Sequence, residues 1–164
     1  MTIEEFVDSR GRALLRFATA LTCDPHLAED IVQEVLLRAQ RRWSRIVSAG
    51  APDGYLRKMV VNEYLSLRRR KSFGDLPAGP EVLAGLSPAV GDPDYGEREE
   101  MLGRIRALPP KQRAVLALRY YSGLTDAEIA EVLGSRPGTV RSHASRALAA
   151  LRVDEFAGTP GGAR

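Results

Sequence analysis

The chain has 164 residues and a net charge of +3; 44% of its residues are hydrophobic and 27% are charged, a composition that allows one medium or two small domains and argues against wholesale disorder. Cys23 is the only cysteine, which excludes an internal disulfide and a multi-cysteine zinc site. No stretch approaches the roughly 18–20 apolar residues of a membrane span, and the acidic N-terminus lacks the apolar region of a signal peptide, so we expect a cytoplasmic protein.

The first half of the chain predicts three helices. The first begins near Thr2, which has capping-box spacing with Glu5, and apolar residues follow at helical intervals. The second begins after Asp24, an N-cap residue that is followed by a first-turn proline. The expected elements are a first helix through Phe6, Leu14, Phe17 and Leu21, a second from Pro25 to about Trp43, a loop over 48–54 and a third helix from Tyr55 to about Arg70.

The segment from Ser72 to Asp94 is rich in glycine and proline and has no convincing period, which predicts a flexible linker. It contains no lysine or arginine, whereas basic residues cluster on both sides of it. This charge distribution indicates a nucleic-acid binder whose acidic connector does something else. The four acids of the linker are Asp75, Glu81, Asp92 and Asp94.

The second half predicts four more helices and a frayed tail. Leu108-Pro109-Pro110 breaks the first of them, and Ser122-Gly123 ends the second. Because no segment has the alternating pattern of a strand, we expect an all-α protein. The expected helices run from Tyr95 to Ala107, from Lys111 to Tyr121, from Thr125 to Leu133, with Thr125 and Glu128 as its cap, and from Pro137 to Arg152.

The strongest local motif runs from Ile129 to Val140. Ala130 is small enough for a close helix contact, Gly134 permits a tight turn, and Val140 anchors the following helix. This spacing is typical of a helix-turn-helix, whose second helix enters a major groove. The alternative is an ordinary helical hairpin with a solvated basic face.

The second helix of this motif is expected to present a polar face to DNA. Arg141 and Arg146 can read guanine edges, and small residues between them allow a close approach. His143 lies to one side, where it would touch a phosphate or be exposed. The candidate DNA-binding residues of this region are Arg136, Gly138, Thr139, Arg141, Ser142, His143, Ser145 and Arg146.

Two separate blocks of the sequence resemble sigma factors. The segments from Leu108 to Tyr120 and from Thr125 to Leu151 resemble domain four. The segment from Ala28 to Ala39 resembles the polymerase-binding helix of domain two, and the segment from Tyr55 to Lys71 resembles the part of domain two that meets a promoter element upstream of the transcription start. Domains one and three of larger sigma factors have no counterpart, so the chain resembles the minimal extracytoplasmic-function class.

This resemblance implies two small helical domains joined by a flexible acidic linker. Its implied partners are core RNA polymerase, through the clamp helices and the flap, and promoter DNA; its implied function is promoter-specific transcription initiation. In this class the linker threads a positively charged polymerase channel, where its acids would stand in for RNA; a plain solvated tether is the alternative. The implied boundaries are 1–72 for domain two, with the polymerase and upstream-element contacts, 73–94 for the linker, 95–153 for domain four, with the second promoter element, and 154–164 for a disordered tail.

The resemblance also implies contact residues in domain two. The second helix has a core stripe, and Leu37 falls among acids and amides on the opposite face, as in a docking ridge with an apolar centre and a polar rim. An incidental exposed leucine is the alternative. The polymerase-binding candidates are Asp30, Gln33, Glu34 and Leu37, and the core stripe consists of Ala28, Ile31, Val32, Val35 and Ala39.

The third helix ends in four consecutive cations, Arg68 to Lys71, which the resemblance assigns to phosphates. Alone, they could equally be a solvated helix end whose charge suits the helix dipole. The loop from about Ser44 to Asp53, with Asn62 nearby, would hold a flipped base. The DNA-binding candidates of this domain are Asn62, Arg68, Arg69, Arg70 and Lys71.

Enzymatic functions find little support in the sequence. His26 and His143 fall in different expected domains, Cys23 has no evident partner, and no glycine-rich phosphate loop is present, so we expect no catalytic residue, cofactor or metal. Two other classes remain open: a one-component regulator without polymerase affinity, and a protein that sequesters a partner without binding DNA. Because the chain has no sensor domain, we expect control from outside, for instance by an anti-sigma factor.

Overall fold

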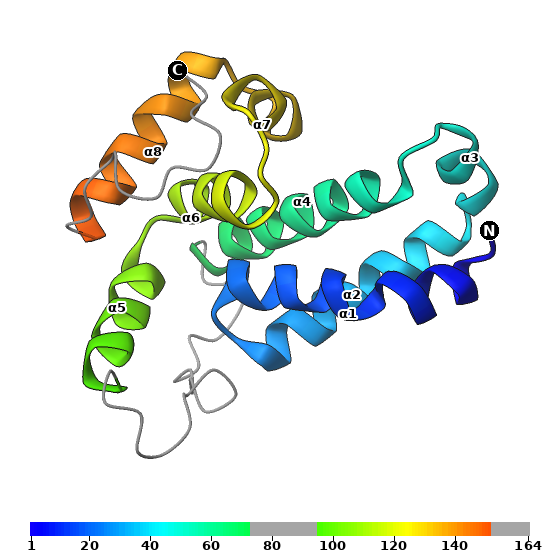
Figure 1. Cartoon of the computed structure of the whole chain (residues 1–164), viewed down its shortest axis with the longest axis horizontal. Helices are drawn as coiled ribbons and strands as arrows, with labels where there is room; N and C mark the ends of the chain where they lie inside the picture. Colours follow the sequence, from blue (N-terminus) through cyan, green and yellow to red (C-terminus); the bar gives the residue numbers. More distant parts are fainter. Residues whose placement is uncertain (73–94, 152–164) are drawn as a thin grey trace. The chain divides into compact units, whose positions relative to one another are not determined.

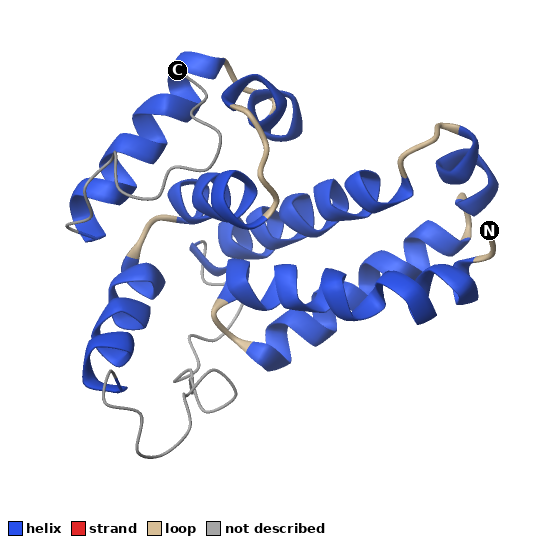
Figure 2. Cartoon of the chain, in the orientation of Figure 1, coloured by secondary structure: helices blue, strands red, loops and turns tan. Residues whose placement is uncertain are grey.

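Every element is helical in the part of the chain that the computed structural model describes, residues 1–72 and 95–151 (Figure 2). The chain divides into two units, Met1–Val82 and Leu83–Arg164, called here the N-terminal unit and the C-terminal unit. The expected all-helical class and its two helical domains are confirmed. The expected linker with its four acids and the expected tail lie outside the described residues.

The N-terminal unit is built on three helices that lie side by side, with a short fourth helix at one end (Figure 1). Both expected N-terminal caps are present. Thr2 and Glu5 form a reciprocal capping box, and the Asp24 carboxylate accepts hydrogen bonds from the backbone N–H groups of His26 and Leu27. The helices are α1 (Ile3–Thr22), α2 (Pro25–Gln40), α3 (Trp43–Ser48) and α4 (Pro52–Ser72).

Large apolar side chains from α1, α2 and α4 fill the core of this unit. Phe17 and Tyr64 are almost completely buried, and burying a side chain of this size contributes about 1.5–3 kcal/mol. All five residues of the predicted α2 stripe are buried, which confirms the orientation of that helix. The remaining core residues include Phe6, Leu14, Leu21, Ile46, Leu56, Val60 and Val61.

The predicted loop over 48–54 is wrong in extent, because only residues 49–51 lie outside helices. Pro52 begins α4, because the fixed φ and missing N–H of proline suit a helix start. Gly50 makes the turn before it, with φ at +90°.

The second helix was expected to run to about Trp43, but α2 ends at Gln40 and Trp43 begins the separate short helix α3. The Trp43 ring packs edge-on against Phe6 with centroids 5.4 Å apart, and its Nε1 donates to the carbonyl of Met1 at 2.9 Å. Tertiary contacts therefore hold α3, which explains why local pattern did not predict it.

In the C-terminal unit, α8 packs against α5, α6 and α7. The helix expected to end at Tyr121 does so through a π-helical segment, η2, in which the N–H of Ser122 bonds to the carbonyl of Ala117. The apolar core includes Leu118, Ile129, Val140 and Leu151. The elements are α5 (Tyr95–Ala107), α6 (Pro110–Leu116), η2 (Ala117–Tyr121), α7 (Asp126–Leu133) and α8 (Pro137–Leu151).

The expected helix-turn-helix is formed by α7 and α8. Thr125 and Glu128 make the predicted capping box at the start of α7. Gly134 ends α7 in the left-handed conformation, with φ at +64°, where a side chain would be strained. Val140 is fully buried and anchors α8. Glycine at the turn and valine in the core thus set the angle at which α8 leaves α7.

Candidate polymerase-binding and nucleic-acid interfaces

The four predicted polymerase-binding residues share one face of α2, opposite its buried stripe. The Leu37 side chain is 62% exposed although it is a large aliphatic group. Asp30 and Gln33 are exposed, and Glu34 is half-buried. An apolar residue in this position is available for burial by a partner, and its neighbours can form a polar rim.

A groove of about 520 Å³ runs beside Leu37, between α1 and α2. Its apolar wall includes Ile3 and Leu36 together with Val7, whose side chain is 40% exposed. Glu4, Asp8, Gln33 and Gln40 complete the lining. The sequence interpretation missed the α1 side of this groove. The available signal was the pair Ile3 and Val7, which stand one helical turn apart and next to acids.

A nearly buried carboxylate, Glu63, links α2 to the end of α4. Glu63 accepts a hydrogen bond from Arg38 Nη1 at 2.9 Å, and its carboxylate lies 3.6 Å from Arg70 Nη2. Arg38 Nε donates a second hydrogen bond to Glu34 at 2.8 Å. The Glu63 carboxylate, followed by the bond to Glu34, raises the pKa of Arg38 above its usual range. A chain of ion pairs therefore connects Glu34, on the predicted polymerase face, with Arg70, in the predicted DNA cluster.

The predicted DNA-binding cations of α4 occupy its last turns. Arg69 and Arg70 are exposed, Arg68 and Lys71 are half-buried, and Asn62 is exposed two turns earlier. Cations at this end also suit the helix dipole, so the solvated-end alternative stays open.

The region predicted to hold a flipped base is mostly helical rather than a loop. A pocket of about 360 Å³ lies at this end of the unit, where α2, α3 and α4 meet. Three arginines line it together with Tyr55, whose side chain is 40% exposed. Cations and an aromatic ring are the groups that favour phosphate and base contacts. The lining residues are Arg38, Ala39, Arg41, Arg42, Ile46, Tyr55 and Met59.

The outer face of α8 carries positive and neutral polar groups and no carboxylate. His143 is half-buried; its burial, with Lys111 and Arg146 nearby, lowers its pKa, so the imidazole is neutral at pH 7. The remaining predicted residues of this region are exposed: Arg136, Gly138, Thr139, Arg141, Ser142, Ser145 and Arg146.

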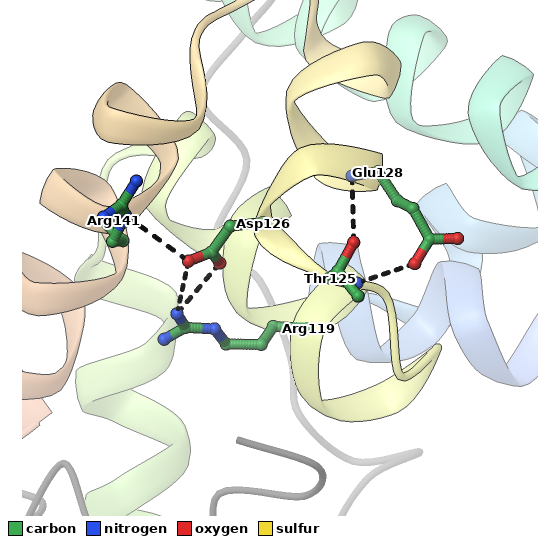
Figure 3. Close-up of polar contacts among 5 residues, drawn as sticks. All are labelled: Arg119, Thr125, Asp126, Glu128 and Arg141. Atoms are coloured by element: carbon green, nitrogen blue, oxygen red, sulfur yellow. Dashed lines mark hydrogen bonds and ion pairs between the residues drawn. The ribbon is translucent and has the colours of Figure 1, made fainter. Parts of the chain in front are cut away.

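A second shared carboxylate, Asp126, lies behind this face (Figure 3). It is 7% exposed, and both of its oxygens accept from Arg119 Nη2, at 2.9 and 3.1 Å. Arg141 Nε lies 3.8 Å from Oδ2. The sequence interpretation missed Asp126 and Arg119, because an acid in the first turn of a helix is commonplace and a partner on another element leaves no local pattern.

Comparisons with known proteins match both units. The family model described as sigma-70 region 2 matches residues 6–73, and that described as sigma-70, region 4 matches residues 98–151. The chain is 35% identical over 154 residues to the RNA polymerase sigma-E factor of Streptomyces avermitilis, covering 94% of this chain and 85% of that protein. It is 32% identical to the ECF RNA polymerase sigma factor SigL of Mycobacterium tuberculosis H37Rv, covering 89% and 84%. The chain belongs to the sigma-70 family. Within it, the chain is a sigma factor of the extracytoplasmic-function class.

A solved structure shares the fold of this sigma factor. It is the sigma factor RpoE in complex with the anti-sigma factor NepR from Bartonella quintana, with a TM-score of 0.68, 24% identity, and coverage of 91% of this chain and 93% of that one. Members of this family are transcription initiation factors, and the expected role in directing transcription is confirmed over the one-component regulator. Among the described helices, none is long and apolar enough to cross a membrane. The described residues also hold no cluster of three or more potential metal ligands.

Proposed function

We propose that this sigma factor divides its work between its two units. Residues 1–72 bind core RNA polymerase and one promoter element, and residues 95–153 read a second element with α8. The observation that carries this division is the contrast between two surfaces. The α2 face centres on a 62% exposed leucine beside an apolar groove, whereas the α8 face carries arginines and small polar residues.

The polymerase-binding surface consists of the α2 face and the adjoining groove. Docking would bury Leu37 and Val7, which are unusually exposed for side chains of their size. Acids at the edge of the groove, Glu4 and Asp8, would attract a basic partner. The family resemblance assigns the clamp helices to the α2 face and the flap to domain four.

In the N-terminal unit, the cations at the end of α4 contact phosphates of promoter DNA. Arg68, Arg69, Arg70 and Lys71 lie on consecutive positions, so they surround the helix end and need no particular base. The arginine-lined pocket beside Tyr55 supports the placement of a flipped base at this end, with Asn62 as a further polar contact.

In the C-terminal unit, α8 enters the major groove. Arg141 and Arg146 contact base edges, and Arg136 and His143 lie against phosphates. Gly138, Thr139, Ser142 and Ser145 are small, so the helix backbone can approach the bases closely. His143 is neutral before binding, and a nearby phosphate would favour its protonation.

Control of this sigma factor comes from a separate protein. The sigma factor of the Bartonella quintana complex is paired with an anti-sigma factor, and we infer a partner of this kind here. A competitor that covers Leu37 and the neighbouring groove would block polymerase docking directly. The sigma factor acts in the cytoplasm, together with polymerase and DNA.

Transcription of genomic DNA by core polymerase, with and without this protein, tests the proposed division. The wild-type chain should direct new transcripts from a defined set of promoters. A variant changed on the α2 face should lose all of them together, because polymerase is not recruited. A variant changed on α8 should instead alter which promoters are used. Identical transcript profiles for the two variants would contradict the division.

A further inference from the structure

We propose that Asp126 is a positioning residue for promoter recognition, which holds the guanidinium of Arg141 in the orientation from which Arg141 contacts a base. The inference rests on the proposed function, since it requires that Arg141 read a base. It goes further because it assigns specificity to a buried residue of the first helix of the motif, which cannot itself reach the bases.

The first partner of Asp126 is fixed. Arg119 comes from η2, its side chain is 11% exposed, and one of its terminal nitrogens donates to both carboxylate oxygens. Its guanidinium also lies over the Tyr120 ring, 5.9 Å from the centroid. Because this cation is largely buried and bonds to both oxygens, the Asp126 carboxylate has a defined position.

The second partner is held more loosely. Arg141 Nε is 3.8 Å from Oδ2 of Asp126, while 64% of the Arg141 side chain is exposed. Nε is the guanidinium nitrogen nearest the helix, so a contact through it restricts the direction of the group and leaves the two terminal nitrogens farther out. The contact reaches Oδ2 from α8, and the same oxygen also accepts a hydrogen bond from Arg119 (Figure 3). Such an arrangement orients a side chain without removing it from the surface.

Orientation matters because arginine has many rotamers. A free arginine must be ordered when it meets a base, and the lost rotamer freedom weakens the contact. An arginine that Asp126 already restrains loses less rotamer freedom when it meets a base. Its side chain also cannot shift to accommodate a wrong base. Arg146 provides an internal comparison on the same helix, because it is exposed and has no ion pair with any described residue.

The test uses holoenzyme, formed from the full chain and core polymerase, and promoters randomised over the element that α8 contacts. The variants are Arg141→Ala, Arg146→Ala, Asp126→Asn and Asp126→Asn with Arg141→Ala. We expect Asp126→Asn to weaken preference by about 3- to 10-fold at the same position that Arg141→Ala affects, part of the roughly 10-fold that a lost base contact costs. Positions that depend on Arg146 should not change. Once Arg141 is alanine, Asp126→Asn should have no further effect on base preference.

Asp126→Asn could also unfold the unit, because it leaves the buried Arg119 cation without its carboxylate. A second variant, Arg119→Met with Asp126→Asn, removes both charges, and melting temperature and helix content identify the variant that stays folded. If Arg141→Ala changes no promoter position, both the proposed role of Arg141 and the positioning role fail. If Arg141→Ala has its effect but the folded Asp126 variant leaves preference intact, or weakens all positions equally, only the positioning role is overturned.

Discussion

In the described residues of each unit of this sigma factor, two arginines share a nearly buried carboxylate, and the two arrangements differ in how deeply the arginines lie. In the N-terminal unit, the arginines that share Glu63 are both about half exposed, with Arg38 at 53% and Arg70 at 50%. In the C-terminal unit, one arginine on Asp126 is 11% exposed and the other 64%. Hydrated ion pairs contribute little to the free energy of unfolding, whereas breaking a buried pair lowers it strongly. The pair between Asp126 and Arg119 is therefore the more costly one to break, whereas Glu63 joins two arginines that water can still reach.

The largest expected stability effect is that of Asp126→Ala. Removing this carboxylate strands the Arg119 cation in a buried site, so the C-terminal unit should lose about 3 kcal/mol or more of its unfolding free energy. Circular dichroism during denaturation of the full chain measures both units. Trp43, the only tryptophan, reports on the N-terminal unit by fluorescence and should be unaffected. A shift in the fluorescence transition would mean that the two units are not independent.

A smaller loss is expected for Glu63→Ala. Arg38 and Arg70 can remain hydrated when the carboxylate is removed, so the N-terminal unit should lose only about 1 kcal/mol. The Trp43 fluorescence transition measures this loss directly. A penalty as large as that of Asp126→Ala would show that the exposure of the arginines does not decide the difference between the two networks.

The smallest expected effect is a pH dependence of the stability of the C-terminal unit, which comes from His143. Burial lowers the pKa of His143 from 6.5, so the unfolded C-terminal unit binds a proton at a higher pH than the folded one. Its stability should be full above pH 6.5 and should fall as the pH drops below that value toward the folded pKa. Glu128, whose pKa is lowered by the hydrogen bond from the Thr125 backbone, stays ionised in this range. Denaturation followed by circular dichroism at pH 7.5 and 5.5 should reveal the loss, and His143→Gln should abolish it.

Features set by local pattern were predictable from the sequence, and features set by contacts between distant segments were not. The α2 stripe, the Thr125 cap and the Gly134 turn each depend on residues within a few positions of one another. In contrast, Trp43 bonds to Met1 across 42 positions, and Arg38 bonds to Glu63 across 25. The α1 side of the groove was missed for the same reason. The fixed pair on Asp126 joins residues only seven positions apart, and it was missed because Arg119 belongs to another element, so the pair leaves no local pattern. Face periodicity predicted which residues point outward, but their roles at a partner remain predictions.

We expect the exposed apolar face of α2 to recruit polymerase independently of α8. The affinity of core polymerase for Leu37→Glu measures this recruitment. Ser9→Glu, which adds the same charge at an exposed position of α1, and Arg141→Ala serve as controls. Because Leu37 is 62% exposed, its replacement should leave the melting temperature and helix content unchanged.

Leu37→Glu should weaken polymerase binding by roughly 30-fold or more, which corresponds to the loss of an interface hot spot of about 2 kcal/mol. Both controls should bind polymerase like the wild type. Wild-type affinity for a folded Leu37→Glu protein would show that polymerase does not dock on this face. An equal loss for Arg141→Ala would show that docking on α2 is not independent of α8.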